Sequence, residues 1–165
     1  MSAADHARSE TGRPDVANFG MLRPPFVYLF AIVAAVALDF MQPLRFLPNE
    51  LGALIGIPIV VAALVLFLLS ARRFKAAGTP VPGNRPTTAI VRSGPYQWSR
   101  NPIYLAFSVT QLGIACWLNS LWVLGTLAAV FGLMTWVVIP REERYLERKF
   151  GAEYLEYKAN VRRWL

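Results

Sequence analysis

The feature that most limits how this chain can fold is a long run without any charged side chain, from Asn101 to Pro140. As a single helix this run would be about 60 Å long, at about 1.5 Å per residue. The hydrocarbon core of a bilayer is only about 30 Å thick. The run is therefore too long for one membrane span and long enough for two.

A break between two spans is available in the middle of this run. Asn119 and Ser120 are polar, and Trp117 and Trp122 lie on either side of them. Tryptophan is favoured where a membrane meets water. We therefore expect a tight helical hairpin, with spans at about residues 102–118 and 121–140.

The hairpin has a consequence for the polar residues at its two ends. Both ends of a hairpin return to the same face of the membrane. Arg100 comes just before the first span, and Arg141, Glu142 and Glu143 come just after the second. The two clusters are about 40 residues apart in the sequence, which is roughly the length of two spans of 20 residues. The hairpin is nevertheless expected to bring them close together.

Two further apolar stretches precede the hairpin, at residues 24–43 and 51–71. Each has about the 20 residues that a spanning helix needs. The only charge within them is Asp39, near one end of its stretch, where an acid can reach the interface. Gly52 and Gly56 form a G-x-x-x-G pattern, which lets two helices approach closely. We expect an all-α polytopic membrane bundle of about four transmembrane helices.

Composition and charge support a membrane protein. Hydrophobic residues make up 55% of the chain and charged residues 16%, against roughly 45–50% and 25% in soluble domains. This excludes an intrinsically disordered chain. The net charge of +7 would suggest nucleic acid in a soluble protein, but here the basic residues flank apolar blocks. We therefore expect a membrane partner and no nucleic acid.

The low number of cysteine and histidine residues excludes several kinds of catalytic or metal site. Cys116 is the one cysteine and His6 the one histidine. An intramolecular disulfide is impossible, and zinc ligation by several histidines, bis-histidine haem and a Ser-His-Asp triad in the core are disfavoured. No phosphate loop or Rossmann glycine motif is present. We expect no metal cofactor.

Orientation and domain boundaries follow from the polar segments. Residues 72–101 carry basic side chains and no acid, and basic loops stay in the cytoplasm. Four spans then place both termini and this segment in the cytoplasm. We expect residues 1–22 to form a polar, flexible tail and residues 23–165 a single domain. A cleaved signal peptide at the N-terminus remains an alternative.

The first candidate cluster for chemistry runs from Ser93 to Tyr104. Gly94 and Pro95 favour a turn, and such turns can leave backbone amides free for a ligand. Arg100 is a permanent cation that can bind a carboxylate through two hydrogen bonds. Composition alone favours an interface anchor, with an arginine and aromatic residues at the mouth of a helix.

The second candidate cluster runs from Pro140 to Gly151. Glu142 and Glu143 are adjacent, so they point in different directions on a helix, and one of them could face the first cluster. A solvated helix with weak Glu–Arg pairs is the alternative. Beyond Gly151, the helical spacing of four apolar residues predicts an amphipathic C-terminal helix on the bilayer or on the other helices. These residues are Tyr154, Tyr157, Val161 and Trp164.

Together the two clusters resemble the isoprenylcysteine carboxyl methyltransferase family and the related phospholipid N-methyltransferases. The family pattern is G-P-Y-x-x-x-R-H-P-x-Y, a helical hairpin, and then E-E-x-x-L-x-x-x-F-G-x-x-Y-x-x-Y. The resemblance covers about the C-terminal half of the chain. The matching residues are Gly94-Pro95-Tyr96, Arg100-Asn101-Pro102-Ile103-Tyr104, Glu142-Glu143, Leu146, Phe150-Gly151, Tyr154 and Tyr157.

This resemblance implies S-adenosyl-L-methionine as methyl donor and a lipidic or prenylated acceptor. The donor would bind over the hairpin, between residues 86–104 and 141–165. Arg100 and Glu143 would be the catalytic residues, with Arg100 holding an acceptor carboxylate and Glu143 mattering more for an amine acceptor. The donor would be lined by Gly94, Pro95, Tyr96, Arg100, Asn101, Pro102, Tyr104, Glu142 and Glu143.

Asn101 departs from the family pattern, which has histidine at this position. Asparagine can donate and accept hydrogen bonds but does not titrate near neutral pH. A proton-transfer role at this position is therefore lost, whereas a binding role can survive. Carboxyl O-methylation is the preferred activity, and the alternatives are phospholipid N-methylation, a membrane reductase using NADPH, and a non-catalytic membrane scaffold.

Overall fold

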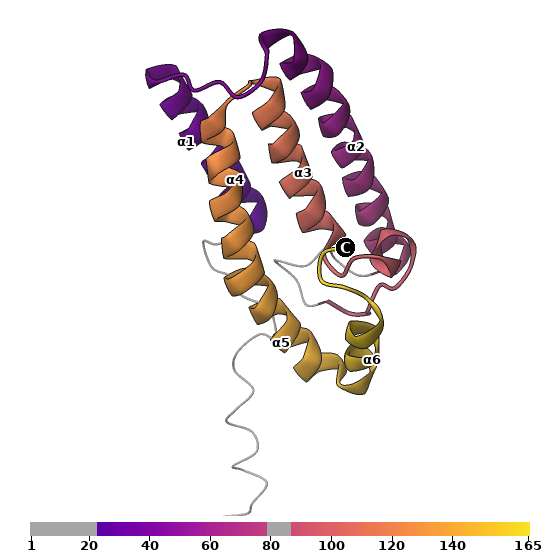
Figure 1. Ribbon diagram of the computed structural model, residues 1–165. Coiled ribbons are helices and arrows are strands. Elements are labelled where there is room, and N and C mark those ends of the chain that lie inside the picture. The colour runs from indigo at the N-terminus through magenta and orange to yellow at the C-terminus, as the bar shows by residue number, and fades with distance from the viewer. Residues whose placement is uncertain (1–22, 79–86) are drawn as a thin grey trace, which may run out of the picture.

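The computed structural model describes residues 23–78 and 87–165, and within these ranges the fold is all-α (Figure 1). The expected tail at residues 1–22 lies outside the described residues. The helices are α1 (Pro24–Met41), α2 (Asn49–Ala76), η1 (Gly94–Gln97), α3 (Pro102–Trp117), α4 (Leu121–Leu133), η2 (Met134–Val138), α5 (Ile139–Phe150) and α6 (Ala152–Asn160). The predicted fold class, an all-α membrane bundle, is confirmed.

Helices α2 and α3 pack against each other at very short range, which the G-x-x-x-G pattern anticipated. The backbone of α2 at Gly56 lies directly against the backbone of α3 at Gly113 and Trp117. A Cβ on Gly56 would be only 2.5 Å from the Gly113 carbonyl oxygen, and a Cβ on Gly113 would be 2.7 Å from a Val60 methyl. Glycine at both positions is therefore what lets the two helices touch.

Helix α1 lies along α4 and also contacts α3 (Figure 1). The hydroxyls of Tyr28 on α1 and Ser108 on α3 are 2.7 Å apart and share a hydrogen bond. Ala35, Ala115 and Val123 are fully buried in a cluster that joins α1, α3 and α4. Small residues at these points allow the three helices to converge.

The hairpin between α3 and α4 turns at Asn119, as the sequence predicts. Asn119 has a φ of +50°, a conformation that asparagine tolerates better than most residues. Its side-chain oxygen accepts hydrogen bonds from the backbone N–H groups of Phe46 and Leu47, and its amide donates to the Leu47 carbonyl. The turn is thus fastened to the α1–α2 loop, where Arg45 pairs with Asp39 at 3.0 Å.

The helix lengths differ from the expected spans at two places. Among the described residues, three helices are long and apolar enough to cross a membrane, at Pro24–Met41, Asn49–Ala76 and Leu121–Phe150, whereas α3 is a shorter apolar helix of 16 residues. The helix that contains the last predicted span does not stop at Pro140. Pro140 directly follows the π-helical turn η2, and the helix continues as α5 to Phe150.

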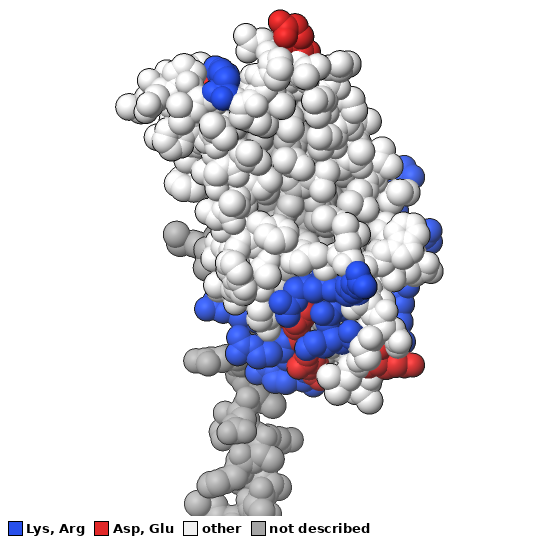
Figure 2. All heavy atoms as spheres, viewed as in Figure 1, with Lys and Arg blue, Asp and Glu red and all other residues white. Residues whose placement is uncertain are grey.

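Most charged residues gather at one end of the molecule, next to an apolar body, and a few lie at the opposite end (Figure 2). The end with most of the charge is called the polar end. The exposed side chains of the body are mostly Leu, Val, Ile and Phe on α1, α2 and α4. The polar end is built by the last turns of α2, by α5 and α6, and by residues 87–101. A large exposed apolar surface of this kind fits contact with lipid.

Candidate functional site

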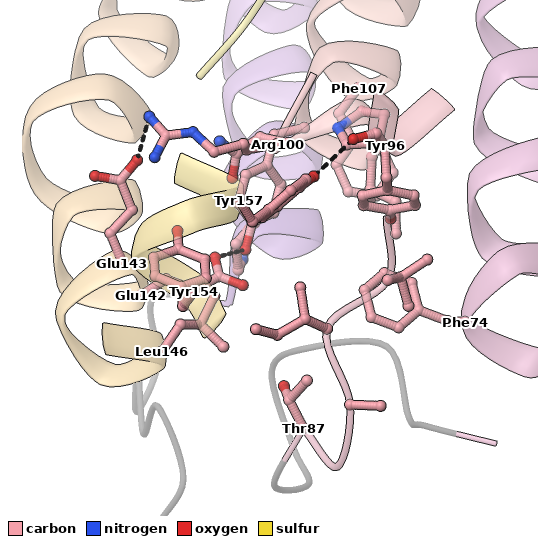
Figure 3. Close-up of a pocket in the computed structure, with 18 of the residues that line it drawn as sticks. Phe74, Thr87, Tyr96, Arg100, Phe107, Glu142, Glu143, Leu146, Tyr154 and Tyr157 are labelled. Atoms are coloured by element: carbon pink, nitrogen blue, oxygen red, sulfur yellow. Dashed lines mark hydrogen bonds and ion pairs between the residues drawn. The ribbon is translucent and has the colours of Figure 1, made fainter. Parts of the chain in front are cut away.

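A cavity of about 340 Å³ lies inside the polar end, where the start of α3 meets α5 and α6 (Figure 3). Its volume is within the range of roughly 300–1,000 Å³ found for small-molecule sites. The segment at residues 87–91 covers one side. The wall is mainly apolar and aromatic, with a few polar groups, and includes Pro24, Phe67, Phe74, Val91, Tyr96, Arg100, Asn101, Tyr104, Phe107, Glu142, Glu143, Leu146, Tyr154 and Tyr157.

Glu143 lies at the centre of the charged part of this wall. Its side chain is 5% exposed and forms ion pairs with Arg100 at 3.2 Å and with Lys158 at 3.9 Å. Arg163 donates to both of its oxygens, from Nε at 3.0 Å and from Nη2 at 2.8 Å. A buried carboxylate needs such partners to remain charged.

Arg100 lines the cavity and carries hydrogen-bond donors that no group in the described residues uses. Its side chain is 9% exposed and reaches Glu143 through Nη2. Its Nε and Nη1 are buried and have no hydrogen-bond partner in the described part of the chain. Unpaired buried donors are costly, so an acidic or polar ligand group would relieve the cost.

Glu142 is held apart from Glu143 by a different set of contacts. It is buried just beyond the apolar stretch of its helix, and the Tyr104 hydroxyl donates to it at 2.9 Å. Burial raises the pKa of Glu142 to about 7; the Tyr104 hydrogen bond opposes this, and the charge of Glu143 adds to it. Glu142 is therefore a carboxyl that can gain or lose a proton near neutral pH.

Aromatic side chains close the other side of the cavity (Figure 3). The rings of Phe74 and Tyr96 meet edge to face, 5.2 Å between centroids. The Tyr157 hydroxyl donates to the Tyr96 carbonyl at 2.8 Å. This hydrogen bond holds α6 over the 3₁₀ turn η1, so both elements cover the cavity on this side.

The last residues of the chain fold back onto the start of α3. The Arg100 N–H donates to the Arg162 carbonyl at 2.9 Å, and the Asn101 side-chain amide donates to the Arg163 carbonyl at 3.0 Å. Trp164 donates to the Thr135 hydroxyl and stacks on Phe131. The segment at residues 161–164 therefore ties the start of α3 to α4 and η2, and it presents Arg163 to Glu143.

The structure brings most of the candidate residues from the sequence into one cavity. Gly94 and Pro95 do not line it: they form the turn η1, where Gly94 has a φ of +64° and contacts the Arg73 side chain. The residues that do line it are Tyr96, Arg100, Asn101, Pro102, Tyr104, Glu142 and Glu143.

One expectation about the C-terminal region needs correction, and one residue of this region was not anticipated. The helix predicted to contain Val161 and Trp164 ends at Asn160, because the chain becomes extended at Val161 to reach Ser99. Arg163 was not singled out from the sequence, although it makes the closest contact with Glu143. The helical spacing of the apolar residues near Arg163 was the signal in the sequence that this end of the chain packs against the bundle.

The fold and cavity define a helical membrane protein with a pocket in its polar end. The profile of the family described as "Phospholipid methyltransferase" matches residues 51–153, which include the hairpin, Arg100 and both buried glutamates. The chain belongs to this family. Members of the family generally use S-adenosylmethionine as methyl donor.

Several curated proteins are similar over part of the chain. An uncharacterised protein of Haemophilus influenzae is 45% identical over 64 residues, which are 38% of this chain and all of that protein. The yeast protein-S-isoprenylcysteine O-methyltransferase is 39% identical over 77 residues, 44% of this chain and 30% of its own length. The cobalt-zinc-cadmium resistance protein CzcN of Cupriavidus metallidurans is 38% identical over 73 residues, 44% of this chain and 33% of its own.

The two longer relatives are therefore matched over about a third of their length. No solved structure matches the chain. One relative is named for metal resistance, but no group of three or more potential metal ligands gathers within residues 23–78 and 87–165.

Proposed function

We propose that this chain transfers a methyl group from S-adenosylmethionine to the carboxylate of a lipidic or prenylated acceptor, in a site that faces the cytoplasm. The observation that carries the proposal is that Arg100 lines the cavity and has two buried donor atoms without a partner in the described residues. A guanidinium matches a carboxylate in shape and charge. Family membership supports the methyl donor, and the similarity to the yeast enzyme supports the carboxylate acceptor.

The wall of the cavity suits two ligands of different polarity. Arg100, Glu142 and Glu143 offer charged and hydrogen-bonding groups on one side, which fit the polar groups of the donor. Phe67 and Phe107, which stack 5.6 Å apart, lie on the side of the membrane helices. An apolar acceptor tail reaching the cavity from the bilayer would contact these rings.

When bound, S-adenosylmethionine supplies an electrophilic methyl group on a positively charged sulfur. The task of the protein is to position the acceptor and to exclude water. Arg100 would hold the acceptor carboxylate, and the Glu143–Arg163 contact would hold Arg100 in place. A carboxylate has no proton to lose, so this reaction needs no general base.

Phospholipid N-methylation is a second candidate, and the environment of Glu142 favours it. An ammonium acceptor must lose a proton before or during methyl transfer. Glu142 has a pKa raised to about 7 and lines the cavity, so it could accept that proton. The family description also names phospholipid methyltransferases.

The test combines donor binding with acceptor screening on the full chain in detergent. Isothermal titration would measure the affinity for S-adenosylmethionine and S-adenosylhomocysteine in the wild type, Arg100→Ala and Glu143→Gln. Arg72→Ala is the matched control, because Arg72 is exposed on α2 outside the cavity. We expect saturable binding that Arg100→Ala and Glu143→Gln weaken and the control does not.

Methyl transfer from labelled donor would then be measured to a prenylated carboxylic acid, to its methyl ester and to phosphatidylethanolamine. Labelling of the acid alone supports O-methylation, and labelling of the amine lipid supports N-methylation. Absence of donor binding by folded protein would overturn both. An affinity that Arg100→Ala and Glu143→Gln leave unchanged would overturn the assignment of these residues.

A further inference from the structure

Helix α5 has a second face, directed away from the cavity, that carries exposed basic side chains. Arg141, Arg144 and Arg148 are all exposed, whereas Glu142 and Glu143 on the same helix are buried. Positions three and seven residues apart lie on one side of a helix. The three arginines line a surface hollow of about 620 Å³ together with Glu147. α5 therefore presents acids to the cavity and a row of arginines to the outside.

These three arginines are not neutralised within the described residues. No ion pair joins any of them to a carboxylate there, and Arg144 only donates through Nε to the Pro140 carbonyl. Glu147, the one acid in the hollow, forms its ion pair with Lys158 on α6. The hollow thus holds three guanidinium groups whose remaining donors are free to bind an anion.

The position along the helix indicates where that anion would be. Helix α4 and η2 are uncharged, and Trp136 is 78% exposed, as expected for a residue in contact with lipid near the membrane surface. Arg141 lies five residues further on and Arg148 twelve, so the row extends from about 8 to about 18 Å beyond Trp136 along the helix axis. That interval corresponds to the lipid headgroups and the water just above them.

We propose that Arg141, Arg144 and Arg148 bind the phosphate headgroup of an anionic phospholipid, at a site separate from the cavity. Guanidinium groups bind phosphate through paired hydrogen bonds, and anionic lipids are attracted to basic clusters at this depth. Figure 2 shows basic side chains gathered at the same end of the molecule. The site does not depend on the proposed methyl transfer.

The test is lipid binding by the full chain in detergent, followed by native mass spectrometry. The probes are phosphatidylglycerol and phosphatidylcholine with identical acyl chains. We expect the wild type to retain phosphatidylglycerol in preference to phosphatidylcholine. The triple variant Arg141→Gln/Arg144→Gln/Arg148→Gln should lose about tenfold to a hundredfold in affinity for phosphatidylglycerol, given the contribution of each basic residue near a charged surface.

The matched control is Arg72→Gln/Arg73→Gln/Lys75→Gln, which removes the same charge from exposed residues on α2. It should keep the lipid preference. Equal losses in both triple variants would overturn the proposal, because net charge would then explain the binding. Full displacement of phosphatidylglycerol by equimolar inorganic phosphate would also overturn it, because the site would then bind free anions. Unfolding temperatures of all variants establish that each is folded.

Discussion

Glu143 and Arg163 are joined by two hydrogen bonds, at 3.0 and 2.8 Å, although 20 positions separate them in the chain. The contact holds the last residues of the chain against a carboxylate that lines the cavity. Arg163 also donates to the Thr135 carbonyl at 3.4 Å. The carboxylate that positions Arg100 is thus itself positioned by the C-terminal segment.

Removing this contact should weaken both the fold and the site. We expect Arg163→Ala to lower the free energy of unfolding by roughly 1–3 kcal/mol, the range for hydrogen bonds to charged groups. Affinity for S-adenosylhomocysteine should fall as well, because Glu143 and Arg100 lose their fixed geometry. Arg162→Ala, with an exposed side chain next to it, is the control. Equal stability and affinity in both variants would contradict the positioning role.

The close contact of α2 and α3 gives a second prediction. Gly56→Ala would place a methyl group against the Trp117 and Gly113 backbones, which cannot move aside as a side chain can. We expect a loss of about 1–3 kcal/mol, as for other overpacked positions, measured by thermal unfolding in detergent. Gly125→Ala is the control, because nothing lies within 4 Å of its new methyl group. A neutral Gly56→Ala would mean that the helices separate at little cost.

A third prediction concerns Asn119, in the turn that joins α3 and α4 at the end of the bundle opposite the cavity. Asn119→Ala removes three hydrogen bonds to Phe46 and Leu47 and places alanine at a φ of +50°. We expect a loss of about 2–4 kcal/mol from unpaired buried groups and backbone strain. Asn119→Gly relieves the strain only, so its unfolding temperature should lie between those of the alanine variant and the wild type. Identical values for both variants would show that the backbone conformation contributes nothing.

The environment of Glu142 predicts a specific pH dependence. Its pKa in the folded protein is about 7, above the ordinary 4.5, so the folded state binds the proton more tightly than the unfolded state. Its contribution to stability is therefore complete below about pH 4.5 and is lost as the pH rises through 7. Glu142→Gln keeps an acceptor for Tyr104 but cannot ionise.

The measurement is the unfolding temperature of both proteins between pH 4.5 and 8. The Gln variant should gain relative to the wild type across this interval, by an amount that reaches a few kcal/mol at about 1.4 kcal/mol per pKa unit. A constant difference over the whole range would contradict the raised pKa. Tyr104→Phe, which removes the hydroxyl that stabilises the charged form, should raise the pKa further.

The sequence predicts the bundle and the meeting of the two polar clusters because both follow from local patterns. An uncharged run of fixed length must fold back at Asn119, and folding back brings Arg100 beside Glu143. What the sequence does not predict is the position of Arg163. That contact depends on the chain becoming extended after Asn160 and pairing with Ser99, which no spacing rule specifies.

The continuation of the helix past the last predicted span is a second feature that the sequence does not predict. Apolar composition stops at Pro140, so the sequence places the boundary there. The helix nevertheless continues through Pro140, which directly follows the π-helical turn η2. Only the backbone geometry, which composition does not record, reveals that α4, η2 and α5 are continuous.

Because of that continuity, the helix from Leu121 to Phe150 sets the position of the cavity carboxylates relative to the apolar body. The height of Glu142 and Glu143 above the bilayer, and their rotation about the axis, are set by the number of residues in one helix and not by a linker. Inserting a single residue before Met134 would turn both carboxylates by about 100° and raise them by about 1.5 Å. Glu143 would then leave Arg100, while every residue of the site was still present.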